Sequence, residues 1–314
     1  MANNTLTAQQ RAQLFAMSTR QNMHMLAKQT AVAFPSTLTF NLPKSRLLSN
    51  IYVSVKYSGL EVGQIEGIRR VSLDLNNGFA PFVVSGSDIY LYNMVDSHAH
   101  NHEAWAHPED ENTFNFKLPV TTNDRDPIGL ILLQNDQTNV TLTIDFANIE
   151  ATSASIEVMT ETFSVPAVGE AMPDLSVLKL VNGRTDSLPS AGQQVIRLST
   201  GTIYRKIMFK LTDADGNPMQ VTDINSNIEI VFNQADINYS VSATMLRILN
   251  EKVLGMKLPD GVFMFDFSNG GGMPNYGGTR DFIDTANLTE FWIRFSTGKV
   301  GKCQIITETL ARLS

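Results

Sequence analysis

The chain has 314 residues, of which 43% are hydrophobic and 18% charged, with one cysteine and a formal net charge of −7. The apolar content excludes a disordered chain, and a single cysteine excludes an internal disulfide or a thiolate zinc cluster. No apolar run reaches the length of about 18 residues that crosses a membrane, and the first residues lack a secretory signal, so we expect use in a reducing compartment.

The first predicted element is a basic helical arm, with a helix over residues 7–28. Thr7 and Gln10 have the spacing of a capping box, and no Gly or Pro follows before residue 28. Its apolar face is thin and holds Leu14, Met17, Met25 and Leu26. Such a helix is marginal alone, so we expect it to order against a partner. The alternative is a frayed helix lying on its own domain.

Charge is distributed unevenly along the chain. No Asp or Glu precedes Glu61, whereas the first 60 residues hold six Lys or Arg, which leaves a net −13 for the remainder. A basic start on an acidic body indicates contact with lipid headgroups, nucleic acid or an acidic neighbouring subunit, unless the asymmetry is accidental. The residues assigned to this membrane-facing or neighbour-facing arm are Arg11, Arg20, Lys28, Lys44 and Arg46.

From Phe34 onward the hydrophobic period changes to two, which is typical of strands. Short strands then follow at regular spacing and predict β-sandwiches. They are expected near residues 37–42, 51–56, 113–118, 128–133, 140–146 and 156–163, and, after a linker over 164–173, near 195–198, 207–211, 228–232, 262–267, 291–295 and 304–310. The predicted organisation is an arm over 1–33, a first sandwich over 34–166 and a second over 167–314.

The two halves repeat each other at nearly constant offsets. Residues 51–55 match 207–211 at 156, and a helix predicted to begin at Ser87 matches one beginning at Ser242 at 155. Residues 114–118 match 263–267 at 149, residues 139–141 match 287–289 at 148, and residues 158–163 match 305–310, both with Thr-Glu-Thr, at 147. We therefore predict an all-β fold of two tandem jelly-roll sandwiches, each with a short inserted helix.

Two loops carry candidate ligands. His98, His100 and His102 share a face if their segment is extended, and three imidazoles on one face suit zinc. This stretch is, however, a six-residue insertion relative to the second half, which favours a surface loop at a subunit contact. Residues 213–218 begin like a calcium loop but lack its closing glutamate, so we expect a hairpin turn. No cofactor and no catalytic residue is predicted.

A Gln- and Arg-bearing arm followed by two jelly rolls resembles the major capsid proteins of tailless icosahedral bacteriophages with an internal membrane. Tectiviruses are the familiar example, and adenovirus hexon is a larger relative. The resemblance rests on residues 7–28, on the strand region 40–55 and on the paired Thr-Glu-Thr strands. It covers the whole chain as architecture.

The resemblance implies a homotrimer whose six similar domains surround a pseudo-sixfold axis and tile an icosahedral shell over the membrane. It implies a place in the virion capsid after assembly in the host cytoplasm. The partners would be neighbouring capsomers, minor capsid or membrane proteins and lipid, without sequence-specific nucleic acid. Two alternatives remain, namely a double-sandwich hydrolase of the glycan-amidase kind and a virion receptor-binding or carbohydrate-binding protein.

Overall fold

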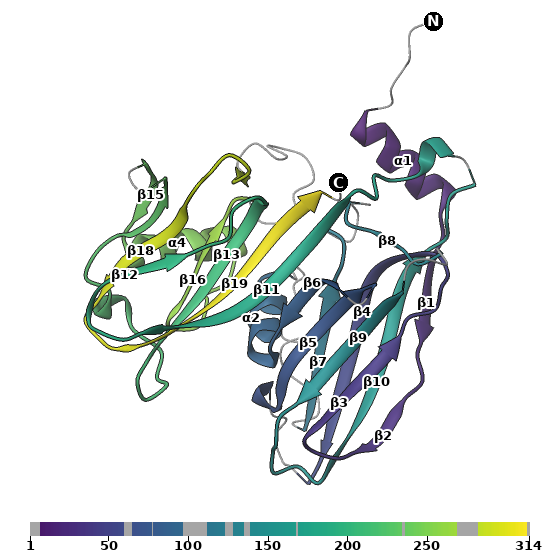
Figure 1. Ribbon diagram of the computed structural model, residues 1–314, viewed down its shortest axis with the longest axis horizontal. Coiled ribbons are helices and arrows are strands. Elements are labelled where there is room, and N and C mark those ends of the chain that lie inside the picture. The colour runs from purple at the N-terminus through teal and green to yellow at the C-terminus, as the bar shows by residue number, and fades with distance from the viewer. Residues whose placement is uncertain are drawn as a thin grey trace, which may run out of the picture. The chain divides into compact units, whose positions relative to one another are not determined.

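The computed structural model describes residues 7–59, 65–76, 78–96, 112–122, 128–134, 139–167, 169–233, 236–268 and 282–312. It is built mainly of strands, as Figure 1 shows. Contacts divide it into two compact units, one of residues 1–180 with 312–314 and one of residues 181–311. The division falls between Leu180 and Val181, within strand β11 (Val177–Leu188), whereas the sequence pattern suggested a boundary at 166–167.

The first unit contains two antiparallel sheets. One has the order β1-β10-β4-β7, with β2 on β10 and β8 on β4, and the other the order β3-β9-β5-β6. The elements are α1 (Ala8–Ser18), β1 (Gln21–Met25), β2 (Gln29–Val32), β3 (Ser36–Asn41), β4 (Leu47–Ser58), η1 (Ile65–Gly67), β5 (Ile68–Leu75), β6 (Phe79–Val84), α2 (Gly86–Asp96), β7 (Thr113–Pro119), β8 (Ile131–Leu132), β9 (Val140–Phe146), β10 (Ser153–Phe163) and η2 (Gly169–Ala171).

The second unit repeats this pairing. One sheet has the order β11-β19-β13-β16, with β17 on β13, and the other the order β12-β18-β14-β15. After β11 the elements are β12 (Gly192–Arg197), β13 (Ile203–Asp213), η3 (Val221–Asp223), β14 (Ile228–Phe232), β15 (Asp236–Val241), α4 (Ala243–Leu254), β16 (Val262–Asp266), β17 (Ile283–Asp284), β18 (Phe291–Thr297) and β19 (Gly301–Arg312).

Both units are jelly rolls with one topology. In each unit, the strand before the inserted helix is the last in one order of four strands, and the strand after it is the last in the other order. The alternation expected for residues 140–146 and 291–295 is present, because β9 and β18 alternate buried and half-buried side chains. The predicted fold of two tandem jelly rolls with inserted helices is confirmed.

The repeat is more regular than the sequence comparison indicated. The cap of α2 is Ser85, whose hydroxyl accepts from the Asp88 amide at 3.2 Å while the Asp88 carboxylate accepts from the Ser85 amide at 2.8 Å. The prediction that Ser87 begins this helix is therefore wrong by two residues. Ser85 matches Ser242, the cap of α4, at an offset of 157. Either serine precedes apolar residues, and only the reciprocal Asp88 bond identifies the cap.

Strand pairing corrects two further offsets. Ile51 faces Leu118 on β7, and its equivalent Ile207 faces Phe265 on β16, which gives an offset of 147 rather than 149. The amide of Asn76 bonds the Asn139 carbonyl, and that of Asn233 bonds the Glu290 carbonyl. Asn139 therefore matches Glu290 and not Asn287. Alternating strands resemble one another after a shift of two, which caused the first error.

The predicted helix over residues 7–28 is wrong beyond Ser18. Thr19 is extended, with φ −115° and ψ 158°, and β1 and β2 then pair with β10. The residues of this segment favour a helix locally, but the hydrogen bonds they form with the edge of β10 stabilise the strands more. The calcium-like segment is the expected turn, because Asp213 accepts the amides of Asp215 and Asn217 and Gly216 has φ +87°.

Candidate functional site

A buried glutamate occupies the same place in both jelly rolls, as the middle residue of each Thr-Glu-Thr triplet. In the first unit, Glu161 of β10 lies opposite Asn50 of β4, beside a bulge at Ser49. Its carboxylate accepts hydrogen bonds from the Tyr52 hydroxyl at 2.6 Å, from the Asn50 amide at 3.2 Å and from the Gln21 amide. All three donors are neutral side chains.

In the second unit the equivalent Glu308 is held by charge. It lies opposite Lys206 on β13, beside the equivalent bulge at Arg205. The Arg205 guanidinium donates to Glu308 Oε1, and the Lys206 ammonium lies 3.6 Å from Oε2. All three side chains are almost fully buried. One repeated carboxylate thus has neutral donors in one jelly roll and two cations in the other.

These buried glutamates connect strands within each unit. Each joins the last strand of its jelly roll to the strand that carries the bulge, and each has its oxygens occupied by neighbouring side chains. A carboxylate held in this way is poorly placed to exchange a proton with a substrate. The geometry indicates a framework role, and the sequence signal for it was the repeated Thr-Glu-Thr.

Asparagines from the two inserted helices form a second repeated contact. The Asn93 side chain of α2 donates to the Lys117 carbonyl at 2.8 Å and accepts from the Lys117 amide. Asn250 of α4 makes the same pair of bonds to Met264. In both cases the amide side chain pairs with the free edge of a strand as another strand would, which covers that edge. The sequence analysis missed both residues.

The N-terminal helix α1 is anchored on the first unit by Phe15. This side chain is buried against Leu47 and Leu130, and its ring meets Phe163 edge-on at 5.4 Å. The alternative of a terminal helix lying on its own domain therefore describes α1. Met17 remains exposed on the same helix. Phe15 was absent from the predicted apolar face, although its aromatic side chain is the largest apolar group of the helix.

The five arm cations are all exposed, in positions on the first unit. Lys28 pairs with Glu157 at 2.6 Å. Arg11 lies near Asp174. The pKa of the Asp174 carboxyl is held below its usual value, mainly by hydrogen bonds from Ser176 and to a smaller extent by the charges of Arg312 and Arg11. Arg20 stands just before β1, and Lys44 and Arg46 stand between β3 and β4. The arm therefore carries part of its charge in local ion pairs.

The candidate metal ligands His98, His100 and His102 lie outside the described residues. Within the described ranges, no group of three or more His, Cys, Asp or Glu side chains is gathered as a metal site. Cys303 is buried in β19, and burial raises the pKa of its thiol. Among the same residues, no helix has the length and apolarity needed to cross a bilayer.

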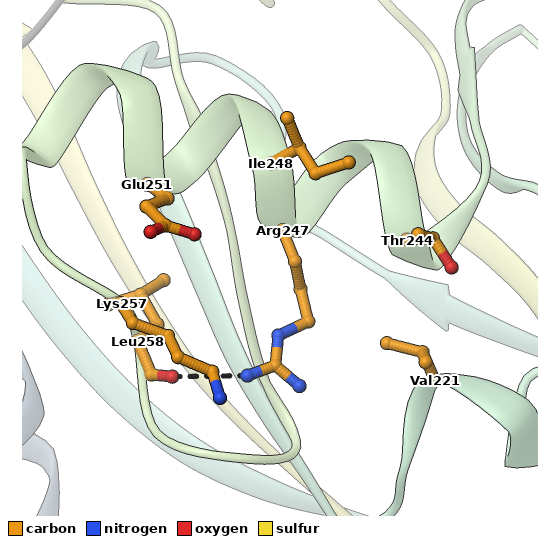
Figure 2. Close-up of a pocket in the computed structure, with 7 residues that line it drawn as sticks. All are labelled: Val221, Thr244, Arg247, Ile248, Glu251, Lys257 and Leu258. Carbon is orange, nitrogen blue, oxygen red and sulfur yellow. Dashed lines mark hydrogen bonds between the residues drawn. The ribbon is translucent and has the colours of Figure 1, made fainter.

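A small hollow lies beside α4 in the second unit. Its volume is about 210 Å³, and Figure 2 shows the lining residues, which are Val221, Thr244, Arg247, Ile248, Glu251, Lys257 and Leu258. Arg247 reaches across it to the Leu258 carbonyl at 3.3 Å and pairs with Asp260 at 2.9 Å. The hydrogen bond that Arg247 donates to the Asp260 carboxylate lowers the pKa of Asp260. The volume is below the roughly 300 Å³ of small-molecule pockets. Glu251 is the one carboxylate in the lining, so the pair used by glycoside hydrolases is absent from it.

Several solved structures with the same architecture are viral capsid proteins. The chain matches the major capsid protein of STIV, Sulfolobus turreted icosahedral virus, with a TM-score of 0.70 and 13% identity over 93% of this chain and 97% of that one. It matches the major capsid protein P2 of bacteriophage PM2 with a TM-score of 0.65 and 13% identity, over 94% and 98%. It matches the PBCV-1 virus capsid with a TM-score of 0.71 and 11% identity, over 93% and 94%.

Sequence comparison adds no relative. No protein-family model matches the chain, and no curated protein does so either. The structural matches extend over nearly the whole of each partner, so the likeness concerns the complete double jelly roll and not a shared single sandwich. The chain therefore has the double jelly-roll fold of these capsid proteins.

Proposed function

We propose that this protein is a viral major capsid protein that acts as a structural building block of an icosahedral shell. The observation that carries the proposal is the full-length match of a two-jelly-roll chain to capsid proteins of three viruses. The identical topology of the two units supports it, because one chain then presents two similar building blocks to its neighbours. The role is structural, and the cavity beside α4 supplies no competing catalytic site.

The capsomer we propose is a homotrimer, with six jelly rolls from three chains, placed in the virion capsid after assembly in the host cytoplasm. Its mass would be about 104 kDa, three times 34.7 kDa. Light scattering on the purified full-length protein, over a range of concentration and salt, tests this stoichiometry. A mass near 104 kDa supports the proposal. A monomer under all conditions would overturn the preformed trimer.

The basic arm is proposed to meet an anionic surface, with an internal lipid membrane favoured and an acidic neighbouring subunit as the alternative. Arg20 and Arg46 support this, because both are exposed on the first unit and neither forms an ion pair with another described residue. Flotation with vesicles containing anionic lipid, against vesicles of neutral lipid alone, measures the interaction. Arg20→Ser with Arg46→Ser should reduce flotation on anionic vesicles and its dependence on salt. Equal flotation on both vesicle types would exclude a charge-driven membrane contact.

Neighbouring capsomers and minor capsid or membrane proteins are the further partners in this proposal. The His-rich segment containing His98, His100 and His102 would contribute a surface loop rather than a metal site. Equilibrium dialysis with Zn²⁺ decides between the two. Tight binding of about one zinc per chain would establish the metal site, and that binding should disappear after replacement of the three histidines by serine.

A further inference from the structure

Helix α4 carries an apolar face that is exposed in the described structure. Met245, Ile248, Leu249 and Val253 recur at spacings of three and four and so share one side of the helix. Between 42% and 52% of each side chain is open to solvent. The opposite side of α4 packs into the core through Ala243 and Leu246, and Asn250 bonds the edge of β16. The helix is thus apolar on two sides, whereas a helix that packs only against the core of its own domain needs one apolar side.

The matching face of α2 is covered. With the offset of 157, Ile248 and Leu249 correspond to Leu91 and Tyr92, which are only 5% and 2% exposed. The Tyr92 hydroxyl accepts a hydrogen bond from the Lys179 ammonium at 3.1 Å, and the same ammonium lies 5.7 Å from the ring centroid. Lys179 belongs to the start of β11. In the first unit, therefore, this helix face contacts the start of a jelly-roll first strand.

The strand equivalent to β11 in the other jelly roll is β1. Strand β11 lies beside β19, and β1 lies beside β10. The bond from Thr160 to the His24 carbonyl has its counterpart in the bond from Thr307 to the Asn182 carbonyl. These bonds align Lys179 with Gln21, and the side chains of Met23 and Met25, which follow Gln21 at every second position of β1, are 62% and 50% exposed. The exposed face of α4 thus has a covered counterpart on α2, and the exposed strand β1 is equivalent to β11, the strand that contacts α2.

We propose that the apolar face of α4 in one copy packs against β1, at Met23 and Met25, in a second copy of this chain. The proposal rests on the proposed self-assembly and identifies the surfaces that carry it. Both surfaces are apolar, and methionine adapts its shape to an irregular partner. Burial of the two faces against each other removes the exposed apolar side chains from water, as Tyr92 and Leu91 are already removed.

Mixed single-cysteine chains test this contact directly. Purified Ile248→Cys and Met25→Cys proteins are combined, allowed to exchange subunits and treated with a short bismaleimide. A cross-linked dimer is expected in the mixture and not in either variant alone, because the linked positions come from different copies. Native Cys303 is buried and does not compete. Val300→Cys mixed with Met25→Cys is the control, since Val300 is 46% exposed in the same unit but lies on the turn before β19.

Charge substitution gives an independent readout. Ile248→Asp should raise the dissociation constant of the oligomer about 30-fold or more, as at an interface hot spot, whereas Val300→Asp should leave it unchanged. Circular dichroism checks that both variants are folded. Trimers that form normally with Ile248→Asp, or equal cross-linking by the Val300 control, would overturn the contact and leave the capsid proposal standing. A chain that carries both Ile248→Cys and Met25→Cys serves as a further check. If cross-linking occurs only within this chain, the contact lies within one copy, and the proposed contact between copies is overturned. A wild-type protein that is monomeric throughout would overturn both this contact and the proposed homotrimer.

Discussion

Replacement of Glu308 by glutamine is expected to destabilise the second unit far more than the same change at Glu161 destabilises the first. The two glutamates occupy equivalent positions beside equivalent bulges. Glu308 faces the buried cations Arg205 and Lys206, whereas Glu161 accepts hydrogen bonds from the neutral side chains of Asn50 and Tyr52. The pair is therefore a matched comparison of one carboxylate in two electrostatic settings.

The magnitudes follow from the partners. Removing the charge at residue 308 leaves two buried cations without their carboxylate, and loss of one member of a buried ion pair costs about 3–5 kcal/mol. At residue 161, the glutamine retains the shape of the side chain and the hydrogen bond from Tyr52. Its amide NH₂ group, however, faces the donating amide of Asn50 or Gln21, so two donors meet without an acceptor. One unsatisfied buried donor costs about 1–3 kcal/mol. The unfolding free energy should thus fall further in Glu308→Gln.

Urea unfolding of the full chain measures both losses. Trp292 on β18 reports the second unit in a Trp105→Phe background, and a tryptophan placed at Phe79 on β6 reports the first in a Trp105→Phe, Trp292→Phe background. Separate reporters are needed because a two-unit chain need not unfold in one step. An equal loss at both positions, or a larger loss at residue 161, would refute the assignment of Glu308 as the charge partner of Arg205 and Lys206.

Three further predictions concern packing and reactivity. Phe15→Ala should release α1, because Phe15 supplies the buried anchor of that helix. Trypsin should then cleave at Arg11 or Arg20 at least about tenfold faster, while the β core resists cleavage. An unchanged rate would show that α1 is held by other contacts. Cys303 should remain unmodified by a thiol reagent in the native protein and react after unfolding, because it is buried and its thiol pKa is raised; rapid native modification would contradict its place in the core. Asn250→Ala should destabilise the second unit by about 1–3 kcal/mol, because the edge of β16 loses two hydrogen bonds; the surface variant Thr244→Ala is its control, and an equal effect of both would exclude a specific role for Asn250.

The sequence allowed prediction of the two jelly rolls because their signal is redundant. Alternation in β9 and β18, repeated serine-capped helices and the paired Thr-Glu-Thr strands all indicate the same architecture. The offset of 147 at the last strand agrees with the structure, since Glu161 and Glu308 occupy equivalent places. A period of two identifies a strand reliably, but it does not distinguish a register from one shifted by two residues.

The features that sequence analysis missed depend on contacts distant in the chain. Residues 21–25 form a strand because β10 offers an open edge, which local helix propensity does not reveal. Phe15 is an anchor because Leu47, Leu130 and Phe163 meet there. The apolar face of α4 is visible in the sequence, but its exposure is known only after the core-facing side of the helix has been identified.

Electron microscopy of the purified oligomer tests the central proposal most directly. We expect single particles of a trimer, near 104 kDa, with six jelly-roll-sized lobes around one axis and a hexagonal outline in projection. Each lobe should accommodate one of the two units described above. Monomers, or an oligomer whose lobes do not form a closed six-membered ring, would contradict the proposed capsomer.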